Sequence, residues 1–249
     1  MINNLLLLSG MDIPFPEAQM VIHAPTIKEI GLIGEESFFN GCGILNFSKD
    51  NLSEQDRVNL ANISEIEILM MIMNNNQIEA QKNKVNALMV LSLLFPDYQI
   101  SFSQKAIHFQ HFENEEEKHV IDDVNFLAFK KILEEMFCLK GRGDDIDNPE
   151  YNPGGRLAKD IAEKFAKRRQ VIAEQQGPQK INILERYASI LSVGLKIDLN
   201  TVLNYTVFQL YDQYERFELQ EQFDLYIKSR LAGAKGDEEI ENWKKDIHI

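Results

Sequence analysis

Apolar side chains recur at helical spacing from residue 27 to residue 39, the first clear element of the chain. They are Ile27, Ile30, Ile33 and Phe38, which share one face of a helix. Thr26 and Glu29 have the spacing of a capping box, in which two side chains accept hydrogen bonds from the free N–H groups of a helix start. A helix is therefore predicted over about 27–39.

Three further helices are predicted in the first region of the chain. Two short ones cover about 53–62 and 64–74, and the second begins with another capping box at Ser64. A long helix should run over about 77–95, because Pro96 cannot continue it. The second half of this helix is almost wholly apolar, so we expect that end to be buried.

The apolar period changes to two between Tyr98 and Asp123, where apolar and polar residues alternate in three short runs. Successive side chains on a strand point to opposite faces, so this alternation predicts a small antiparallel β-meander near 98–123. Helical spacing resumes over about 126–137, and Gly141 follows. The predicted fold class is mainly α (α+β), with the meander as its sheet.

The clearest loop is residues 141–155, where glycine, proline, aspartate and asparagine dominate and no apolar period survives. It separates a helical region with the meander, residues 1–140, from a helical C-terminal region, residues 156–249. Such a composition buries little apolar area, so the loop is expected to be exposed. Three helices are predicted in the C-terminal region, over about 156–176, over about 181–194, and from about Thr206 onward.

Acidic residues outnumber basic ones by 39 to 26, and the formal net charge is −13. This excess repels a phosphate backbone and disfavours nucleic acid as a partner. The basic side chains that do cluster lie on the predicted helix 156–176, and they are Lys159, Lys164, Lys167, Arg168 and Arg169. Apolar residues recur among them at helical spacing. We interpret the stretch as an amphipathic helix with a solvated basic face, with binding of an acidic partner segment as the alternative.

The chain has two cysteines, Cys42 and Cys138, and neither belongs to a CxxC motif or a close histidine–cysteine pair. A disulfide framework or structural zinc site is therefore not indicated, and a reducing compartment fits the composition. The apolar run Leu5–Leu8 is too short for a signal peptide or a membrane span. The sequence thus favours a cytoplasmic protein without a membrane segment.

No pattern of ionisable residues points to catalysis or to a bound metal or cofactor. His108 and His111 are three residues apart in a predicted strand, so they face opposite ways and could share a metal only at a bulge. An EF-hand beginning at Asp145 and Asp147 fails because Arg156 stands where the bidentate acid belongs, which leaves a looser cation site as the alternative. Neither a phosphate-binding loop nor a GxSxG elbow occurs. We predict no enzyme, and no catalytic, cofactor-binding or metal-binding residue; an enzyme whose site is assembled from residues distant in sequence is the alternative.

Aromatic residues recur every three positions around the start of the last predicted helix, as Tyr205, Phe208, Tyr211, Tyr214 and Phe217. At 3.6 residues per turn such a series drifts around the helix axis, so it must meet several neighbours. Core packing is one interpretation, and a partner-binding surface is the other, because tyrosine tolerates half-wet interfaces. The pattern is extended by Phe223, Tyr226, Ile227 and Leu231. The partner-binding candidates are Phe208, Tyr211, Tyr214, Phe217, Tyr226 and, among polar neighbours near the chain end, Trp243.

Two long blocks of sequence carry a family likeness. They are HAPTIKEIGLIGEESFF at 23–39 and YTVFQLYDQYERFELQEQFDLYIKSRLAGAKGDEEIENWKKDI at 205–247, with an acidic Asp-Asn-Pro and Gly-Gly-Arg loop between them. Together they resemble a family of tailed-phage proteins, the tail-assembly chaperones. Residues 44–125 resemble this family only in pattern. Neither block is a chemical motif, so the likeness rests on its length and supplies no active-site residue.

The resemblance implies a binding protein that acts in virion morphogenesis. Proteins of this kind bind the tape-measure protein and tail-tube proteins during tail assembly, and they need not remain in the virion. A tape-measure protein is long, helical and apolar on one face, so its carrier needs an acidic exterior with surfaces for amphipathic helices. The expected partners are tape-measure protein and other phage tail proteins, in the cytoplasm of the infected bacterial host or in the virion tail. A homo-oligomer is a further alternative.

A second interpretation keeps the protein in the particle. The chain would then be a structural component or adaptor of a phage tail or baseplate that is retained in the virion. Analysis of purified virions separates the two interpretations, because a structural component is present there in stoichiometric amounts.

Overall fold

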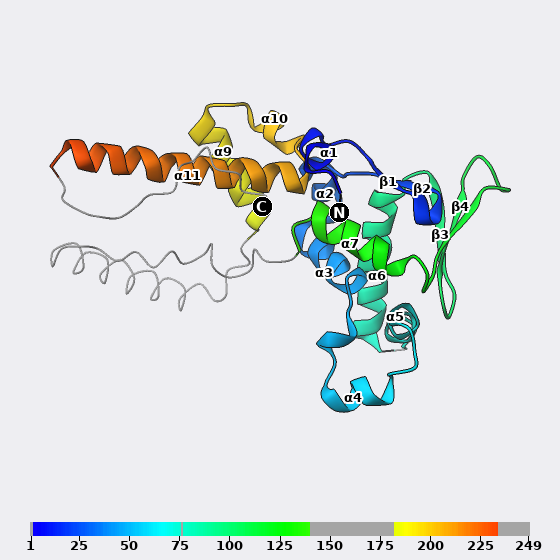
Figure 1. Ribbon diagram of the computed structural model, residues 1–249. Coiled ribbons are helices and arrows are strands. Elements are labelled where there is room, and N and C mark those ends of the chain that lie inside the picture. The colour runs from blue at the N-terminus through cyan, green and yellow to red at the C-terminus, as the bar shows by residue number, and fades with distance from the viewer. Residues whose placement is uncertain (1, 76, 140–181, 234–249) are drawn as a thin grey trace.

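The computed structural model describes residues 2–75, 77–139 and 182–233, and Figure 1 shows how their elements are arranged. Within these ranges the fold is mainly helical with small antiparallel sheets, which confirms the predicted fold class. Three features of the sequence interpretation lie outside the described residues. They are the loop 141–155, the basic helix over about 156–176, and Trp243.

The chain begins with a helix and a small hairpin that the apolar pattern did not predict. α1 (Asn4–Ser9) ends at Gly10, which adopts a left-handed conformation. β1 (Ile13–Phe15) and β2 (Met20–Ile22) pair antiparallel on either side of the 3-10 turn η1 (Pro16–Ala18). Strands of three residues are too short for an alternating pattern to be recognised, although their inward side chains are buried.

The helix predicted over about 27–39 is in fact two helices, and this prediction is wrong at its middle and at its end. The capping box at Thr26 is present and starts α2 (Ile27–Ile33). Gly34 then adopts a φ of 83°, which breaks the helix. α3 (Glu35–Leu45) follows and extends six residues beyond the predicted end.

The predicted helices around residues 53–95 are all present. η2 (Lys49–Asn51) and α4 (Glu54–Asn59) form the tip of the molecule at the bottom of Figure 1, and α4 has no buried residue. α5 (Glu65–Met73) has the predicted capping box. α6 (Ile78–Leu94) has a buried C-terminal end, as its apolar half predicted.

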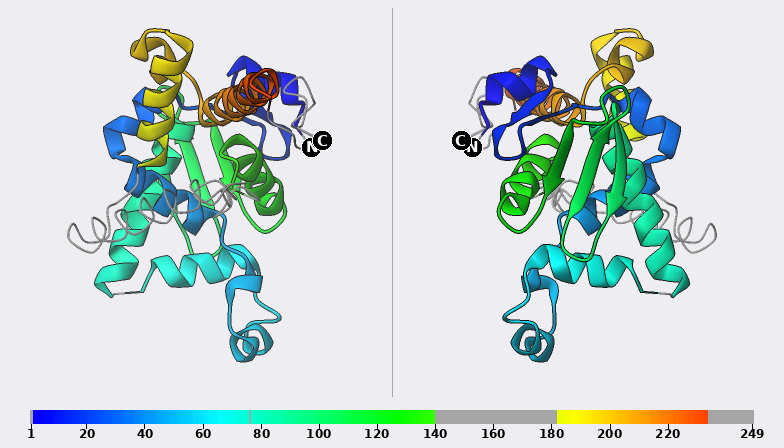
Figure 2. Two further views of the ribbon diagram at one scale, coloured as in Figure 1. Left: turned by 90° about the vertical axis from the view of Figure 1, so that its left-hand side faces the viewer. Right: turned by 90° about the vertical axis from the view of Figure 1, so that its right-hand side faces the viewer.

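The predicted meander is present as β3 (Tyr98–Phe102), β4 (Ile107–His111) and β5 (Lys118–Ile121), paired antiparallel in that order. The sheet lies across one side of the molecule (Figure 2, right), and its inner face packs on α6 and α7 (Phe126–Met136). The ring centroids of Phe95 and Phe109 lie 4.6 Å apart at this contact. α7 also confirms the helix that the sequence predicts over about 126–137.

The C-terminal part of the described chain contains α9 (Ile183–Leu195), α10 (Leu199–Leu203) and α11 (Val207–Leu231). α9 and α11 were predicted, whereas the five-residue α10 was not. The buried residues of these helices belong to the same hydrophobic core as those of residues 2–139. The helical N-terminal region and the start of the C-terminal region are thus packed together.

α2 and α11 begin side by side. Thr26 and Thr206 form an isolated antiparallel bridge, and the backbone N–H of Ile27 donates to the Tyr205 carbonyl at 2.8 Å. Each threonine also caps its own helix through a capping box. This junction fixes the point from which α11 leaves the body.

Candidate partner-binding surface

α11 packs on the body with its first half only. Its neighbours among the described elements are α1, α7 and α9. Figure 1 shows the helix passing these elements and then extending away on the side opposite the meander. The last of its buried residues is Tyr214, so the helix continues for seventeen residues, 215–231, without another buried side chain.

The predicted partner-binding residues among those described differ in burial and in place along α11. Phe208 and Tyr214 are 8% and 6% exposed, so both belong to the core. Tyr211 and Phe217 are half-buried against the body. Tyr226 lies in the extended half of the helix, where it is half-exposed.

Tyr214 is held on three sides. Its ring stacks on Tyr187 of α9 with centroids 3.7 Å apart, and Tyr211 packs edge-on against that same Tyr187 ring. The Tyr214 hydroxyl donates to the Glu218 carboxylate at 2.7 Å. Burial and this carboxylate both raise the pKa of Tyr214, because each disfavours the phenolate. The contacts identify Tyr214 as a packing residue.

Phe217 marks the point where cover by α9 ends. A Cβ at Gly194 would overlap the Phe217 ring, so the missing side chain at Gly194 lets the ring lie on the α9 backbone. The neighbouring Val193 is 80% exposed. Figure 1 shows α11 continuing past α9 beyond this contact.

The extended half of α11 has an apolar face that we name the α11 stripe. Its members are Leu219, Phe223, Tyr226, Ile227 and Leu231, which follow helical spacing. Phe223 comes nine residues after Tyr214, and at ~100° per residue this places it on the opposite side of the helix. Ile227 is 40% and Leu231 84% exposed. The apolar series therefore continues around α11 onto a side that no described element covers.

Charged residues are interspersed along the same half of α11. At ~100° per residue, Glu218 and Glu221 lie on the opposite side of the helix from Phe223, whereas Arg230 shares its side. The Arg230 Nε donates to the Tyr226 hydroxyl at 3.0 Å. The sequence pattern gave the spacing of these residues, but only Tyr226 among the stripe was predicted as a partner-binding residue.

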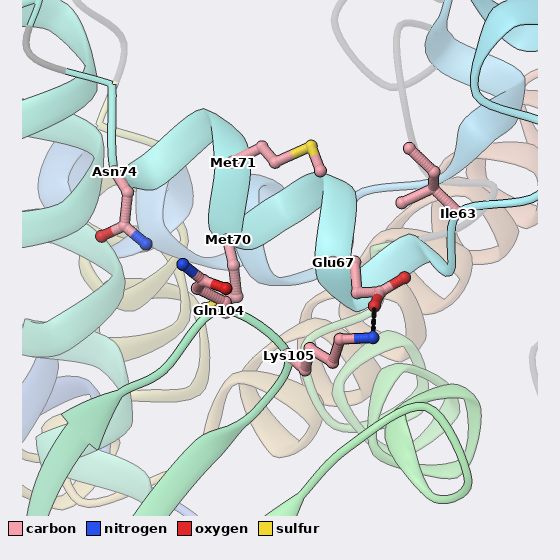
Figure 3. Close-up of a pocket in the computed structure, with 7 residues that line it drawn as sticks. All are labelled: Ile63, Glu67, Met70, Met71, Asn74, Gln104 and Lys105. Atoms are coloured by element: carbon pink, nitrogen blue, oxygen red, sulfur yellow. Dashed lines mark ion pairs between the residues drawn. The ribbon is translucent and has the colours of Figure 1, made fainter.

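A pocket of about 440 Å³ lies elsewhere, between α5 and the turn that joins β3 to β4 (Figure 3). Its lining is Ile63, Glu67, Met70, Met71, Asn74, Gln104 and Lys105. Lys105 and Glu67 form an ion pair at 2.6 Å beside it, and this hydrogen bond holds the pKa of Glu67 below its ordinary value. Asn74 accepts from Lys84 at 3.3 Å. Sequence reasoning did not identify this pocket, because its two walls are thirty residues apart.

The histidines are used in the packing of the meander. His111 and His119 both pack against the Tyr98 ring, with centroids 5.3 and 5.7 Å away. His108 instead contacts Ser103 at 3.0 Å and points to the other face, as strand alternation predicts. Within the described ranges, no group of three histidine, cysteine or carboxylate side chains is placed to hold a metal ion.

Neither cysteine forms a disulfide with a described residue. Cys42 is buried in α3 and Cys138 is half-buried after α7. Burial raises the pKa of the Cys42 thiol, which disfavours the reactive thiolate. Among the described helices, none is both long enough and apolar enough to cross a membrane.

Residues 176–248 match the family model of the YomV second domain. This range includes α9, α10 and α11, and therefore the α11 stripe. No curated protein and no solved structure matches the chain.

Proposed function

We propose that this chain is a non-enzymatic binding protein of a tailed phage, and that its α11 stripe holds an amphipathic helical segment of the tape-measure protein during tail assembly. The observation that carries the proposal is the extended half of α11, which exposes apolar side chains on the side away from α9. An apolar helical face is the surface that helix-in-groove recognition uses.

The size of the α11 stripe suits a reversible complex. Burying a single large apolar side chain contributes about 1.5–3 kcal/mol, and a dissociation constant near 1 μM corresponds to about −8 kcal/mol. Association itself costs about 4–15 kcal/mol, which offsets much of what five such residues contribute. The α11 stripe therefore suits a weak, reversible complex, and a carrier must release its cargo.

The chemistry of the partner follows from the apolar members of the α11 stripe, which favour a helix with an apolar face of its own. YomV is a phage-related protein of uncertain role, and its second-domain model covers this surface, which supports a phage origin. The likeness of 205–247 to tail-assembly chaperones supports the same assignment. We place this activity in the cytoplasm of the infected host.

The test is co-expression of the tagged chain with the tape-measure protein of the same phage. A Phe223→Ala, Ile227→Ala double variant should reduce co-purification by about tenfold or more, which corresponds to a loss of 1.4 kcal/mol. Leu225→Ala is the matched control, because Leu225 is 64% exposed on the same helix but lies off the stripe. Equal co-purification of wild type, double variant and control would reject the α11 stripe as the binding surface.

Purified virions test the role separately. A chaperone should be absent from them, or present only in trace amounts, when they are analysed by mass spectrometry. Stoichiometric amounts would instead assign the protein to the tail or baseplate as a structural component or adaptor.

A further inference from the structure

A second hollow of about 440 Å³ lies between α3, α5 and α6, and we name it the asparagine groove. Its apolar lining is Phe39, Ile44, Phe47, Leu69 and Ile72. Its polar lining is Asn40, Glu79, Lys82, Asn83 and Asn86. Leu69 and Ile72 lie on the opposite face of α5 from Met70 and Asn74, which line the pocket of Figure 3. The two hollows are thus separated by α5.

The polar side chains of the asparagine groove have no partners in the described part of the chain. Asn86 is the informative one, because it is only 5% exposed and yet its carboxamide makes no hydrogen bond there. Asn125 is equally buried, at 6%, but its amide donates to the Val120 carbonyl and its oxygen accepts from the Asp122 N–H, both at 2.9 Å. Among the described residues, the side-chain atom that is both fully buried and unpartnered is Asn46 Oδ1, so the Asn86 carboxamide atoms are still reached by solvent in the groove. Asn86 therefore presents unused hydrogen-bonding groups to the groove.

Two glycines of α3, Gly41 and Gly43, differ in what surrounds them, and Gly43 lines the groove. A Cβ at Gly41 would lie 2.5 Å from the Asn86 backbone oxygen, so close packing of α3 on α6 requires that glycine. Gly43 also lies in the helix, where glycine is unfavourable, but a Cβ there would meet nothing within 4 Å. Helix packing therefore explains why residue 41 is glycine, but it does not explain why residue 43 is glycine. At Gly43 the α3 backbone itself is open to the groove.

The lining selects the chemical class of the ligand. A carboxamide both donates and accepts, which matches the peptide group, and three carboxamides stand beside an apolar floor. Lys82 is offset by Glu79, so the groove has no excess positive charge for a phosphate. A pure hydrocarbon would leave Asn86 without hydrogen bonds. The volume lies within the range of about 300–1,000 Å³ that is usual for ligand sites.

We infer that the asparagine groove binds an extended apolar peptide segment of a partner protein, with its main-chain amides bonded to Asn83 and Asn86 and its side chains on the apolar floor. Asn40 lies at the exposed rim and meets the peptide where it enters. This site is independent of the α11 stripe, which accepts a helix. Either site can fail its test without affecting the other.

The test uses a panel of blocked tetrapeptides that differ only in their apolar side chains, leucine, isoleucine, valine or phenylalanine. The full chain is labelled with ¹⁵N-asparagine, and the side-chain NH₂ signals of Asn83 and Asn86 are assigned by substitution. At least one peptide should shift both signals saturably. The same peptide with methylated main-chain nitrogens should bind about tenfold more weakly, because it has lost its donors. No saturable shift with any peptide, or equal binding of the methylated form, would overturn the inference.

Two variants test the site without relying on the asparagines alone. Gly43→Leu fills the groove and should abolish peptide binding while the melting temperature is unchanged or higher. Gly31→Leu is the matched control, because Gly31 is an exposed helical glycine with open space around it, away from the groove. Asn86→Leu should weaken binding, because it removes a carboxamide from the groove. Peptide binding that survives both Gly43→Leu and Asn86→Leu would place the peptide elsewhere.

Discussion

Two helix pairs, α3 with α6 and α9 with α11, both pack closely at a glycine, but the second helix of each pair ends in a different environment. Each pair approaches closely over a glycine, Gly41 beneath the α6 backbone and Gly194 beneath the Phe217 ring. α6 then ends inside the core, with Leu94 and Phe95 buried. α11 instead leaves its partner helix and continues with exposed apolar residues. Close packing in the first pair completes the fold, whereas in the second it anchors a helix whose second half has no buried residue.

The largest expected effect tests the anchored half of α11. Tyr214→Ala should lower the free energy of unfolding by about 3–5 kcal/mol, because it removes a buried ring that stacks on Tyr187. Urea denaturation followed by circular dichroism measures this change. A loss below about 1 kcal/mol would show that the first half of α11 is not core, and the contrast between its halves would disappear.

The α3–α6 pair is tested by two glycine substitutions two residues apart. Gly41→Ala should destabilise by about 1–3 kcal/mol, because its methyl group would push against the Asn86 backbone. Gly43→Ala should stabilise by about 0.8–1 kcal/mol, since alanine favours a helix and the space is open. Thermal melts of both variants give the comparison directly. If both changes have the same sign, Gly41 does not set the distance between the helices.

A third prediction concerns pH. Burial alone would raise the pKa of Glu65, but hydrogen bonds from Lys130 at 2.7 Å, the Lys49 N–H and the Ser48 hydroxyl outweigh it and hold the pKa below its ordinary value. The folded pKa is lower than the unfolded one, so the stabilisation is full above the ordinary value of 4.5 and is lost as pH falls through the lowered pKa.

Lys130→Met should therefore cost on the order of 1 kcal/mol near neutral pH, and the difference from wild type should shrink in acid. Urea unfolding at about pH 7 and about pH 3 measures it. Lys105→Met, which removes the exposed partner of Glu67, is the control and should change stability less. A difference for Lys130→Met that grows in acid would contradict the assignment of the pair.

The smallest expected effect is in the extended half of α11. Tyr226→Ala should change the free energy of unfolding by no more than about 0.5 kcal/mol, because the side chain is half-exposed and its hydrogen bond to Arg230 is on the surface. The same denaturation assay that follows Tyr214→Ala measures this variant. A large loss of stability would mean that this half of the helix is also part of the fold.

Most regular elements could be predicted from the sequence, because long apolar periods and capping boxes are local signals. The break at Gly34 could not, since the apolar period runs through it and only the φ of 83° shows the interruption. β1 and β2 are too short to give a period. In each case the missing information is geometric and not a matter of residue type.

The candidate site was only partly predictable for a related reason. Tyr214 and Tyr226 belong to the same recurring pattern in the sequence. Tyr214 is buried because Tyr187 of α9 stacks on its ring, and α9 packs close to α11 at Gly194. These α9 residues are far from Tyr214 in the sequence, so the pattern alone does not show the contact. The asparagine groove gives no sequence signal at all. Asn86 and Asn125 are the same residue type, and only the structure shows that one is bonded and the other is not.

The junction where α2 and α11 begin has a mechanical consequence. The start of α11 is fixed to the body, because Thr206 forms a β-bridge with Thr26 and the Gln209 side chain donates to the Leu8 carbonyl at 2.8 Å. The packing of Tyr214 on Tyr187 of α9 adds a second support farther along the helix. A partner held by the extended half, as proposed, would therefore be connected to α1, α2 and α9 through hydrogen bonds and packed side chains.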